Sequence, residues 1–512
     1  MKPVKNSKNP TKTVQFQIPP EVSRVTETLK NAGFEAFLVG GCVRDLILER
    51  KPKDWDVTTN ATPEQITALF PKTFYENKYG TVGVVDEATS DETLKIVEVT
   101  PYRTESTYSD FRRPDEVKWS DKLEDDLARR DFTVNAIALN STKSSKTLAK
   151  QDLFDCTMVD PYKGQEDIIK RTIRTVGEAK DRFNEDALRI IRAVRFATDL
   201  NFAIATETEE AIRLHMKLLE HISKERIRDE FSKLLMTKNP MIGIEMCRRL
   251  GILEYMVPEL LKAVGIEQNQ AHAYHVWEHL LRSLQHAADK GWPLDIRLSA
   301  LFHDISKPET RRFSHETKQF TFYGHEVVGA RVTRKIMERL HFPAILTEKV
   351  VKLVRWHMFF SDTEQITLSA VRRMVANVGK EHIWDLMNVR ICDRIGTGRP
   401  KADPYRLRKY HAMIEEAMRD PISVGMLKID GKKIMEVTRE TPSPRIGLIL
   451  HALLEEVLED PKKNTEEFLV KRALELSKIP PNDLKTLGEA GKDKKEEEDE
   501  KLVTELHKKH RV

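Results

Sequence analysis

The segment from residue 36 to residue 58 restricts the fold of this chain more than any other. Its apolar start predicts a strand, Gly40 and Gly41 predict a turn, and a short helix and a second strand follow. Residues two apart on a strand point to the same face, so Asp54 and Asp56 of the second strand should converge. Two adjacent carboxylates suit Mg²⁺, and the backbone N–H groups of a glycine turn before a helix suit an anion. The segment therefore predicts a site for a metal-bound polyphosphate.

Each part of this pattern is common alone, because many Gly-Gly pairs only make turns and many Asp-x-Asp pairs only solvate loop ends. In this order and spacing, with Arg44 between them, the two parts resemble motif A of the nucleotidyltransferases that build and repair the CCA end of tRNA. The resemblance implies that Gly40, Gly41 and Arg44 contact the nucleotide. It also implies that Asp54 and Asp56 are catalytic and bind Mg²⁺.

Composition excludes several other classes of protein. With 512 residues the chain is too long for one hydrophobic core, and its length predicts roughly three or four domains. No apolar run approaches the roughly 20 residues of a membrane span, and the polar N-terminus lacks the apolar core of a signal peptide. We therefore expect a cytoplasmic protein without membrane association. Four widely separated cysteines indicate neither a disulfide framework nor a zinc ribbon. Because 85 basic and 81 acidic side chains nearly cancel, any nucleic-acid surface must be local.

The spacing of apolar residues changes from that of strands to that of helices along the chain. Short runs rich in β-branched residues predict strands at residues 36–39, 55–58, 81–85, 94–100 and 134–139. Beyond residue 167 the spacing predicts helices, among them residues 187–197, 224–236, 298–303, 327–340 and 446–458. The predicted class is α+β, with a mixed-sheet head followed by a mostly α-helical remainder.

Residues 124–136 (EDDLARRDFTVNA) closely resemble motif B of the same family. A helix end that runs into a strand would explain the apolar pattern, but not two adjacent arginines before Asp131. In the family this segment contacts the ribose and phosphates of the nucleotide. The resemblance therefore implies that Arg130, Asp131 and Asn135 bind the nucleotide.

Residues 185–189 (EDALR) resemble the motif with which the family reads the incoming base. On a helix, Asp186 and Arg189 are three residues apart and share a face. Cytosine and adenine each present an amino donor beside an unprotonated ring nitrogen, so a carboxylate next to a guanidinium satisfies both, while guanine and uracil present the reverse pattern. Taken alone, the pair would be an ordinary surface ion pair. The resemblance also implies nucleotide contacts from Arg192 and Arg195.

Residues 102–114 look like the flexible loop that helps the base pocket of the family change from C to A. The residues implied to act there are Asp110, Arg112 and Arg113. Relatives that add only CC have a shortened loop, so the full length of this one favours addition of the terminal A.

Two further features belong to the predicted head and neck. Glu98 ends a strand, where it either reaches the metal site or is an exposed strand carboxylate. Residues 225–231 match motif E of the family, on a helix that we expect to brace the neck.

The middle of the chain is rich in histidine. His279 precedes an apolar segment that contains His303 and Asp304, and His325, His357 and Asp393 follow. Any one of these histidines would by itself be an ordinary core residue. Together they resemble the HD-type metal-dependent phosphohydrolases, which implies a divalent metal ion that activates water for phosphate-ester hydrolysis. The ligands implied are His279, His303, Asp304 and Asp393.

One departure concerns Ser306, which stands where the HD pattern usually has glycine, so that hydrolysis stays an open question at this point.

The resemblances together imply a Mg²⁺-dependent enzyme that adds CCA, or its terminal A, to tRNA from CTP and ATP and releases pyrophosphate. The alternatives are a poly(A) polymerase, which shares the head, and an HD phosphohydrolase whose degenerate head only binds RNA. The predicted organisation is a disordered N-terminus (1–20), nucleotidyltransferase head (21–165), helical neck (166–265), HD domain (266–400), helical tRNA-binding region (401–478) and charged, disordered tail (479–512).

Overall fold

A computed structural model describes residues 13–75, 80–106, 116–148, 151–268, 273–315, 318–358, 366–399 and 404–488. The chain divides into two compact units. Unit 1 runs to Thr237 and includes Ile242–Met256, and unit 2 contains Lys238–Met241 and the chain from Val257 onward. Within the described ranges, no helix is long and apolar enough to cross a membrane.

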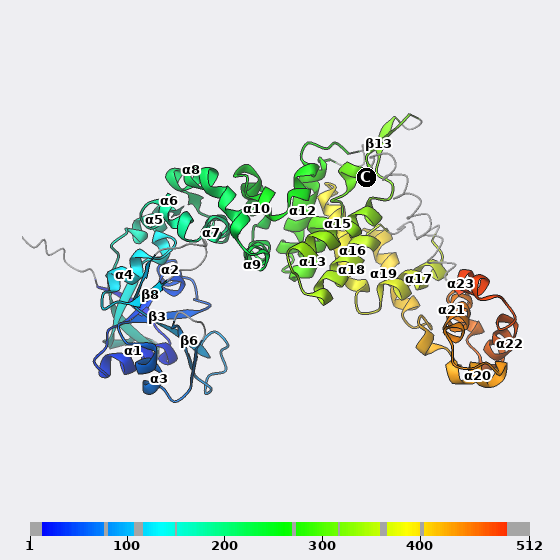
Figure 1. Ribbon diagram of the computed structural model, residues 1–512, viewed down its shortest axis with the longest axis horizontal. Coiled ribbons are helices and arrows are strands. Elements are labelled where there is room, and N and C mark those ends of the chain that lie inside the picture. Colours follow the sequence, from blue (N-terminus) through cyan, green and yellow to red (C-terminus); the bar gives the residue numbers. More distant parts are fainter. Residues whose placement is uncertain are drawn as a thin grey trace, which may run out of the picture. The chain divides into compact units, whose positions relative to one another are not determined.

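Unit 1 is built on an eight-stranded mixed sheet of order β1-β10-β9-β2-β3-β6-β5-β4 (Figure 1). In this sheet β3 pairs with β6 in parallel, and the other pairs are antiparallel. The strands are β1 (Thr13–Gln17), β2 (Ala36–Val39), β3 (Trp55–Thr59), β4 (Thr73–Tyr75), β5 (Val82–Val85), β6 (Ile96–Pro101), β9 (Ala138–Leu148) and β10 (Gln151–Val159). The mixed sheet confirms the predicted class.

Helices pack on the sheet and then continue without it. In α1 (Pro20–Asn31) the buried residues Val22, Val25 and Leu29 recur at helical spacing and hold the helix on β2 and β3. The other helices of unit 1 are α2 (Gly41–Ile47), α3 (Pro63–Leu69), α4 (Leu123–Ala128), α5 (Gly164–Lys170), α6 (Ala179–Glu185), α7 (Leu188–Leu200), α8 (Thr206–His215), α9 (Lys224–Leu235) and α11 (Leu253–Met256). Helix α10 (Pro240–Arg249) spans the division between the units.

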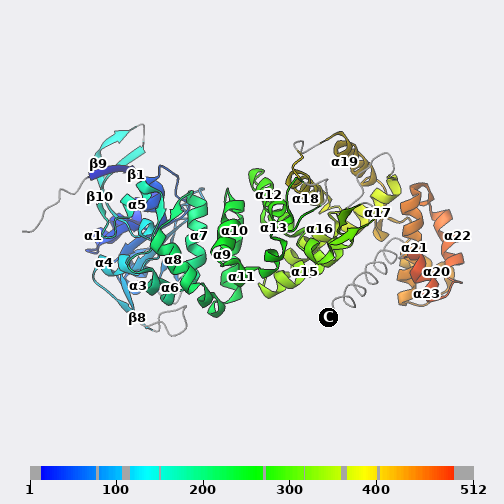
Figure 2. The same ribbon diagram turned by 90° about the horizontal axis from the view of Figure 1, so that it is seen from above.

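Two predictions for this unit are wrong in part. Residues 13–17, predicted to be disordered, form β1, which pairs with β10 at the edge of the sheet (Figure 2). Their alternation of half-buried and exposed side chains is the pattern of an edge strand. The predicted strand at 134–139 is a 3₁₀ turn, Thr133–Asn135, before β9 begins at Ala138.

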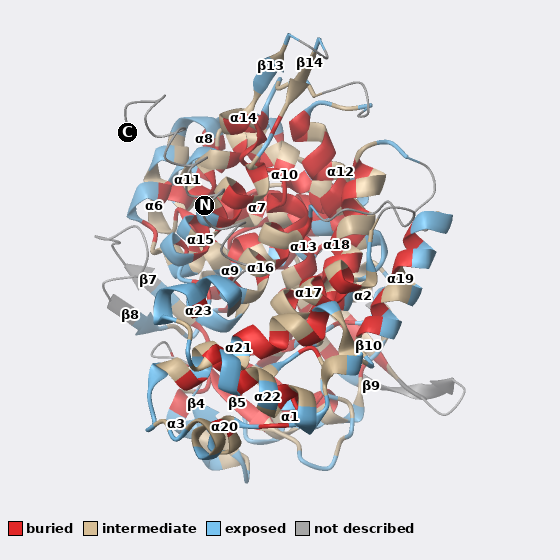
Figure 3. Ribbon diagram, turned by 90° about the vertical axis from the view of Figure 1, so that its right-hand side faces the viewer, coloured by how far each residue is buried: buried red, intermediate tan, exposed pale blue. Residues whose placement is uncertain are grey.

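Within its described residues, unit 2 is helical apart from the short hairpin of β13 (Arg312–Ser314) and β14 (Gln319–Thr321). Buried residues follow the inward faces of its central helices (Figure 3). These are α12 (Val276–Asp289), α13 (Leu294–Phe302), α15 (His325–Arg339), α16 (Ala344–Trp356), α17 (Leu368–Val378), α18 (Ile383–Gly396) and α19 (Tyr405–Ala417). The short α14 (Lys307–Thr310) follows α13.

The C-terminal helices of unit 2 are α20 (Gly431–Thr438), α21 (Pro444–Glu459), α22 (Glu466–Leu476) and α23 (Pro481–Gly488). Helix α23 packs on α21 and buries Leu484, so the prediction of a disordered tail from residue 479 is wrong for this segment. One apolar side chain in a charged stretch is enough to dock a short helix.

Candidate active sites

The glycine turn of unit 1 brings a carboxylate and a guanidinium to one point. Gly40, between β2 and α2, has a φ of 81°, which favours glycine. A Cβ atom at this position would lie 3.0 Å from Asp56 Oδ2 and 3.1 Å from Arg130 Nη1. Asp56 on β3 and Arg130 after α4 therefore both approach the bare backbone of the turn. A carboxylate, a guanidinium and the backbone of the turn therefore meet where the sequence predicts the triphosphate.

The partner of Asp56 on the strand is Glu98, whereas the sequence predicted Asp54. Asp54 precedes β3 and is exposed, so its predicted place on the strand is wrong. In the parallel register Asp56 stands opposite Glu98 of β6, and paired residues point to the same face of a sheet. Carboxylate oxygens are the donors that Mg²⁺ prefers, so Asp56 and Glu98 fit the predicted ion, but among the described residues Asp54, Asp56 and Glu98 do not gather into one set of ligands.

A chain of hydrogen bonds joins four of the residues predicted to bind the nucleotide. Arg44 Nη1 donates to Asn135 Oδ1 (2.7 Å), and Asn135 Nδ2 donates to Asp131 Oδ1 (3.2 Å). The other oxygen of Asp131 accepts from Nε and Nη2 of Arg192 (2.9 and 2.6 Å). Burial alone would raise the pKa of Asp131, but the charge and hydrogen bonds of Arg192, together with Arg189 and Asn135, outweigh burial and lower the pKa to about 2. The carboxylate is thus ionised and fixed between α7 and the motif B segment.

Arg195 continues this cluster toward α9. Its Nε donates to Glu230 Oε2 at 2.5 Å, and Glu230 is buried. The guanidinium carbons of Arg44, Arg192 and Arg195 lie 5.4, 5.3 and 4.0 Å from the ring centroid of Phe196. Three cations around one aromatic ring make this part of unit 1 suited to an anion.

The predicted base-reading pair does not share a helical face. Asp186 has an extended backbone between α6 and α7, and its Oδ1 accepts from the backbone N–H of Leu188 (3.1 Å), the first residue of α7. Its Oδ2 accepts from Arg226 Nη2 of α9 at 2.7 Å. Arg189 instead donates to Glu185 Oε2 (2.6 Å) and to the backbone oxygen of Arg129 (2.9 Å). Motif E therefore contacts the base-reading motif directly, a role that sequence reasoning did not assign to Arg226.

We expect Arg226→Ala to raise KM for both CTP and ATP by about tenfold or more, because a hydrogen bond to a charged group contributes roughly 1.5–3 kcal/mol. Incorporation of UTP should rise as well, since Asp186 loses the group that orients it. Steady-state kinetics with each NTP measures both effects. The matched control is Arg228→Ala on the same helix, whose side chain pairs with the neighbouring Asp229. Unchanged KM and unchanged selectivity in Arg226→Ala would refute the positioning role.

The predicted flexible loop lies largely outside the described residues. This applies to Asp110, Arg112 and Arg113, whose roles stay predictions. The described strands that flank the loop, β7 (Arg103–Ser106) and β8 (Glu116–Trp119), pair antiparallel.

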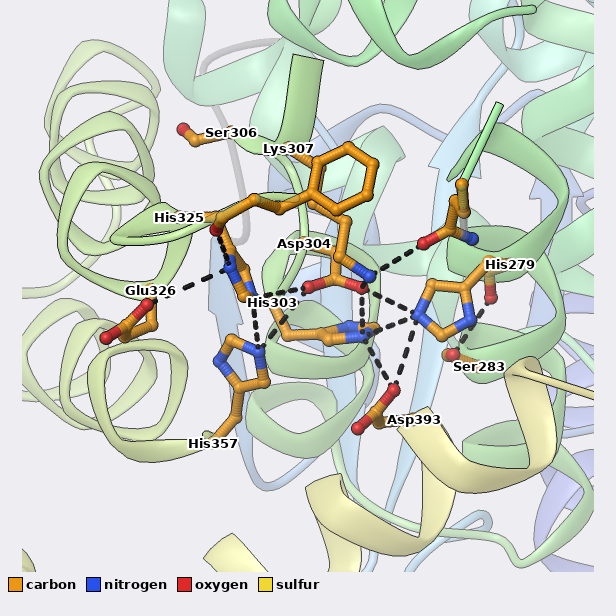
Figure 4. Close-up of polar contacts among 12 residues, drawn as sticks. His279, Ser283, His303, Asp304, Ser306, Lys307, His325, Glu326, His357 and Asp393 are labelled. Carbon is orange, nitrogen blue, oxygen red and sulfur yellow. Dashed lines mark hydrogen bonds and ion pairs between the residues drawn. The ribbon is translucent and has the colours of Figure 1, made fainter. Parts of the chain in front are cut away.

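In unit 2 the four residues predicted as HD ligands converge (Figure 4). His279 Nε2 of α12 lies 2.9 Å from Asp304 Oδ2, 2.8 Å from His303 Nε2 and 3.5 Å from Asp393 Oδ1 of α18. Neighbouring ligands of one ion with bonds of about 2.1 Å lie about 3 Å apart, so these separations suit a single divalent metal. All four side chains are buried.

The second oxygen of Asp304 faces two more histidines (Figure 4). Asp304 Oδ1 lies 3.0 Å from His325 Nε2 and 3.4 Å from His357 Nε2. Sequence reasoning noted these two histidines without assigning them as ligands. They begin α15 and follow α16, and no fixed spacing relates them to His303 and Asp304.

Backbone carbonyls orient three of the four histidines. The Nδ1 atoms of His303, His325 and His357 lie 2.9, 2.6 and 2.7 Å from the backbone oxygens of Ala300, Phe322 and Val354. Because a carbonyl only accepts, each Nδ1 carries the proton, and Nε2 points toward Asp304. A ring nitrogen that donates to a backbone carbonyl while the other ring nitrogen faces the metal site is typical of metal-binding histidines.

Without a metal the cluster holds a proton. Burial opposes a charge on His303, but the carboxylates of Asp304 and Asp393 outweigh burial and raise the pKa of His303 to about 10. Burial lowers the pKa of His357 to about 4. Metal binding must therefore displace a proton from His303.

Comparison with known proteins finds three families that match successive parts of the chain. Residues 36–174 match the family described as Poly A polymerase head domain, residues 201–264 the probable RNA and SrmB-binding site of polymerase A, and residues 276–381 the HD domain. The CCA-adding enzyme of Geobacillus thermodenitrificans is 32% identical over 457 residues, which cover 89% of this chain and 96% of that protein. The chain belongs to the CCA-adding enzyme family. The family predicted from the sequence is thereby confirmed.

Other members of the CCA-adding enzyme family align over shorter stretches. The enzyme of Geobacillus stearothermophilus is 46% identical over 57% of this chain and 65% of its own length. The enzyme of Bacillus cereus strain Q1 is 44% identical over 48% of this chain and 58% of its own length. The solved structure of the Bacillus stearothermophilus CCA-adding enzyme in complex with CTP covers 90% of this chain and 98% of that one, with a TM-score of 0.63 and 27% identity.

Proposed function

We propose that this member of the CCA-adding enzyme family adds CCA, or its terminal A, to the 3′ ends of tRNA from CTP and ATP. The observation that carries the proposal is the meeting of Asp56, Arg130 and the Gly40 turn. Similarity to CCA-adding enzymes over most of the chain supports it. The poly(A) polymerase alternative rests on the matches to the head domain and to the adjoining RNA-binding segment, both of which are described by the name of that polymerase. A tRNA substrate would place the protein in the cytoplasm.

In the reaction the 3′-hydroxyl of tRNA attacks the α-phosphate of the nucleotide and pyrophosphate leaves. The residues that would hold Mg²⁺ are Asp54 and Asp56, with Glu98 beside Asp56, and the ion supplies charge neutralisation and a more acidic hydroxyl. Backbone N–H groups of the glycine turn and the guanidinium of Arg130 bind the triphosphate. Asp131, fixed by Arg192 and Asn135, orients the ribose side.

Asp186 and Arg189 select the base of the incoming nucleotide. The carboxylate accepts from the amino group of cytosine or adenine, and the guanidinium donates to the adjacent ring nitrogen. Both side chains already form hydrogen bonds within the protein, Arg189 with Glu185 and Asp186 with Arg226. The nucleotide must therefore share or replace these contacts. Wrong bases leave these polar groups unsatisfied.

The decisive experiment supplies CTP and ATP, singly and together, with tRNAs that end before the CCA, after CC and after CCA. Addition that stops after the terminal A is expected. Unlimited addition of A would support the poly(A) polymerase instead. Addition of A only to the tRNA that ends in CC would restrict the activity to the last step.

We infer a second function, metal-dependent hydrolysis of phosphate esters, at the HD site. It is favoured by the convergence of five buried side chains on Asp304, three of them histidines that backbone carbonyls orient. Ser306, which stands where glycine is usual, is buried two residues after Asp304. Divalent ions bound there would activate water. Release of phosphate from p-nitrophenyl phosphate with Mg²⁺, Mn²⁺ or Ni²⁺ tests the inference.

A further inference from the structure

A row of paired residues crosses the sheet of unit 1 from the glycine turn to the edge strand β4. Asp56 of β3 lies beside the Gly40 turn at one end of the row. On its other side Glu98 of β6 stands opposite Asp56, and Gly83 of β5 stands opposite Glu98. Phe74 of β4 stands opposite Gly83. Because directly opposite residues project to the same face of a sheet, Phe74 shares the face of the proposed reaction centre.

The ring of Phe74 lies over Gly83. A Cβ atom at Gly83 would lie 2.5 Å from Cε1 of Phe74 and closer still to Cζ, so the ring occupies the space that a larger side chain would fill. The far edge of the ring is therefore above β5, the strand next to Glu98. Neighbouring strands are about 4.8 Å apart, which places this edge about 10 Å from β3. Glycine at position 83 thus brings an aromatic surface to within two strands of Asp56.

This aromatic surface is open to solvent. Phe74 is 41% exposed, and Ile96, which lies two residues before Glu98 on the same face of β6, is 44% exposed. A ring over a strand glycine also stabilises a sheet, and that role explains the contact with Gly83. It leaves an apolar face exposed beside two carboxylates. Such a face suits a ligand whose flat apolar part is joined to a part that reacts at the carboxylates.

The direction of the reaction decides which substrate this face can take. In phosphoryl transfer the attacking and leaving oxygens lie roughly in line with the phosphorus between them. The triphosphate is proposed to bind at the Gly40 turn and Arg130, so the leaving pyrophosphate lies on that side of Asp56. The attacking 3′-hydroxyl must then come from the opposite side, where Gly83 and Phe74 lie.

We propose that Phe74 and Gly83 form a platform for the last nucleotide of the tRNA that is being extended. The inference rests on the nucleotide addition proposed above and extends it to the second substrate. The base stacks on the ring of Phe74, and the ribose lies over β6 with its 3′-hydroxyl toward Asp56. Stacking on an aromatic ring accepts every base. The platform therefore serves each addition, although the last nucleotide of the tRNA changes from one addition to the next.

The test uses the full-length protein, ATP and a tRNA that ends in CC. Phe74→Leu keeps an apolar cover over Gly83 and removes the stacking surface, so we expect KM for tRNA to rise about tenfold and KM for ATP to stay within about twofold. Phe74→Tyr keeps the ring and should retain the KM of the wild type. The matched control is Tyr75→Ala, because Tyr75 is the next residue of β4, is 55% exposed and points to the other face.

A second substrate separates stacking from a structural role of Phe74. It is a tRNA of the same length whose last nucleotide lacks its base. The wild type should show about a tenfold higher KM for this tRNA, because no base is present to stack. Phe74→Leu should show no further rise, since the variant and the modified tRNA remove the same contact.

The outcomes separate the platform from the proposed function. If the wild type adds nucleotides and Phe74→Leu has an unchanged KM for tRNA, the platform is overturned and the proposed function stands. An equal rise in Tyr75→Ala would also overturn the platform, because the effect would then belong to the edge strand as a whole. So would independent, multiplying losses from Phe74→Leu and the missing base. A wild type that extends no tRNA would overturn the proposed function and the platform together.

Discussion

Replacing Asp56 by asparagine is expected to reduce the rate of nucleotide addition by at least about 10³-fold, with little change in KM for CTP. The substitution keeps the size of the side chain and removes the negative charge that the proposed Mg²⁺ site needs. Because the geometry of the Gly40 turn is retained, the nucleotide should still bind. Single-turnover kinetics with tRNA and CTP measures the rate, and equilibrium binding of CTP measures the affinity.

Two variants make this experiment specific. Asp86→Asn removes a carboxylate of unit 1 that pairs only at the surface with Arg24, and it should leave addition unchanged. Glu98→Gln tests the third carboxylate, the register partner of Asp56. A loss of rate near that of Asp56→Asn would make Glu98 a metal ligand, and wild-type activity would make it a strand carboxylate only. Full activity of Asp56→Asn would contradict the proposed reaction centre.

The strand, turn and helix around Gly40 could be predicted because local rules decide them. Apolar residues bounded by glycine form β2, and a positive φ is available at Gly40 without strain. The rules fail at residues 134–137, which are all buried. A run that is buried throughout carries no alternation of exposure, so it does not distinguish a strand from the 3₁₀ turn Thr133–Asn135, which follows the bridge between Phe132 and Thr175.

The base-reading motif shows a different limit. Its residues were predicted as a group, but their partners come from segments far away in sequence. Asp186 is bonded to a residue 40 positions later, and Arg189 to a backbone oxygen 60 positions earlier. Helical spacing alone predicted that the two side chains face each other. Asp186 accepts a hydrogen bond from Leu188 N in a local turn, as short acidic side chains often do, and its backbone is extended instead of helical.

The HD site was half predictable for the same reason. His303 and Asp304 are adjacent, and their chemistry is visible in sequence. His325 and His357 join them only because α15 and α16 pack together. Helical periodicity does not predict which way residues at the ends of helices face, so only the fold shows that His325 and His357 lie at the site.

Asp304→Asn is expected to abolish metal binding and phosphate release at the HD site while addition to tRNA continues. Asp304 contributes one oxygen to each group of donors, so one substitution disrupts both. A neutral amide also cannot balance His303 and Lys307, and the buried cluster loses the charge that keeps it together. In the wild type a divalent ion at 100 times its dissociation constant should stabilise unit 2 by about 2.7 kcal/mol, a shift that the variant should lack.

Metal content by mass spectrometry, thermal unfolding with and without Mn²⁺, and phosphate release together measure this effect. The matched control is Asp385→Asn on α18, whose carboxylate pairs with Lys349 instead of the cluster. If Asp304→Asn retains both metal and hydrolysis, the HD assignment is wrong. If it loses addition to tRNA as well while Asp385→Asn does not, the cluster also maintains the fold that addition requires, because Asp304 lies in unit 2 and the proposed nucleotide site in unit 1.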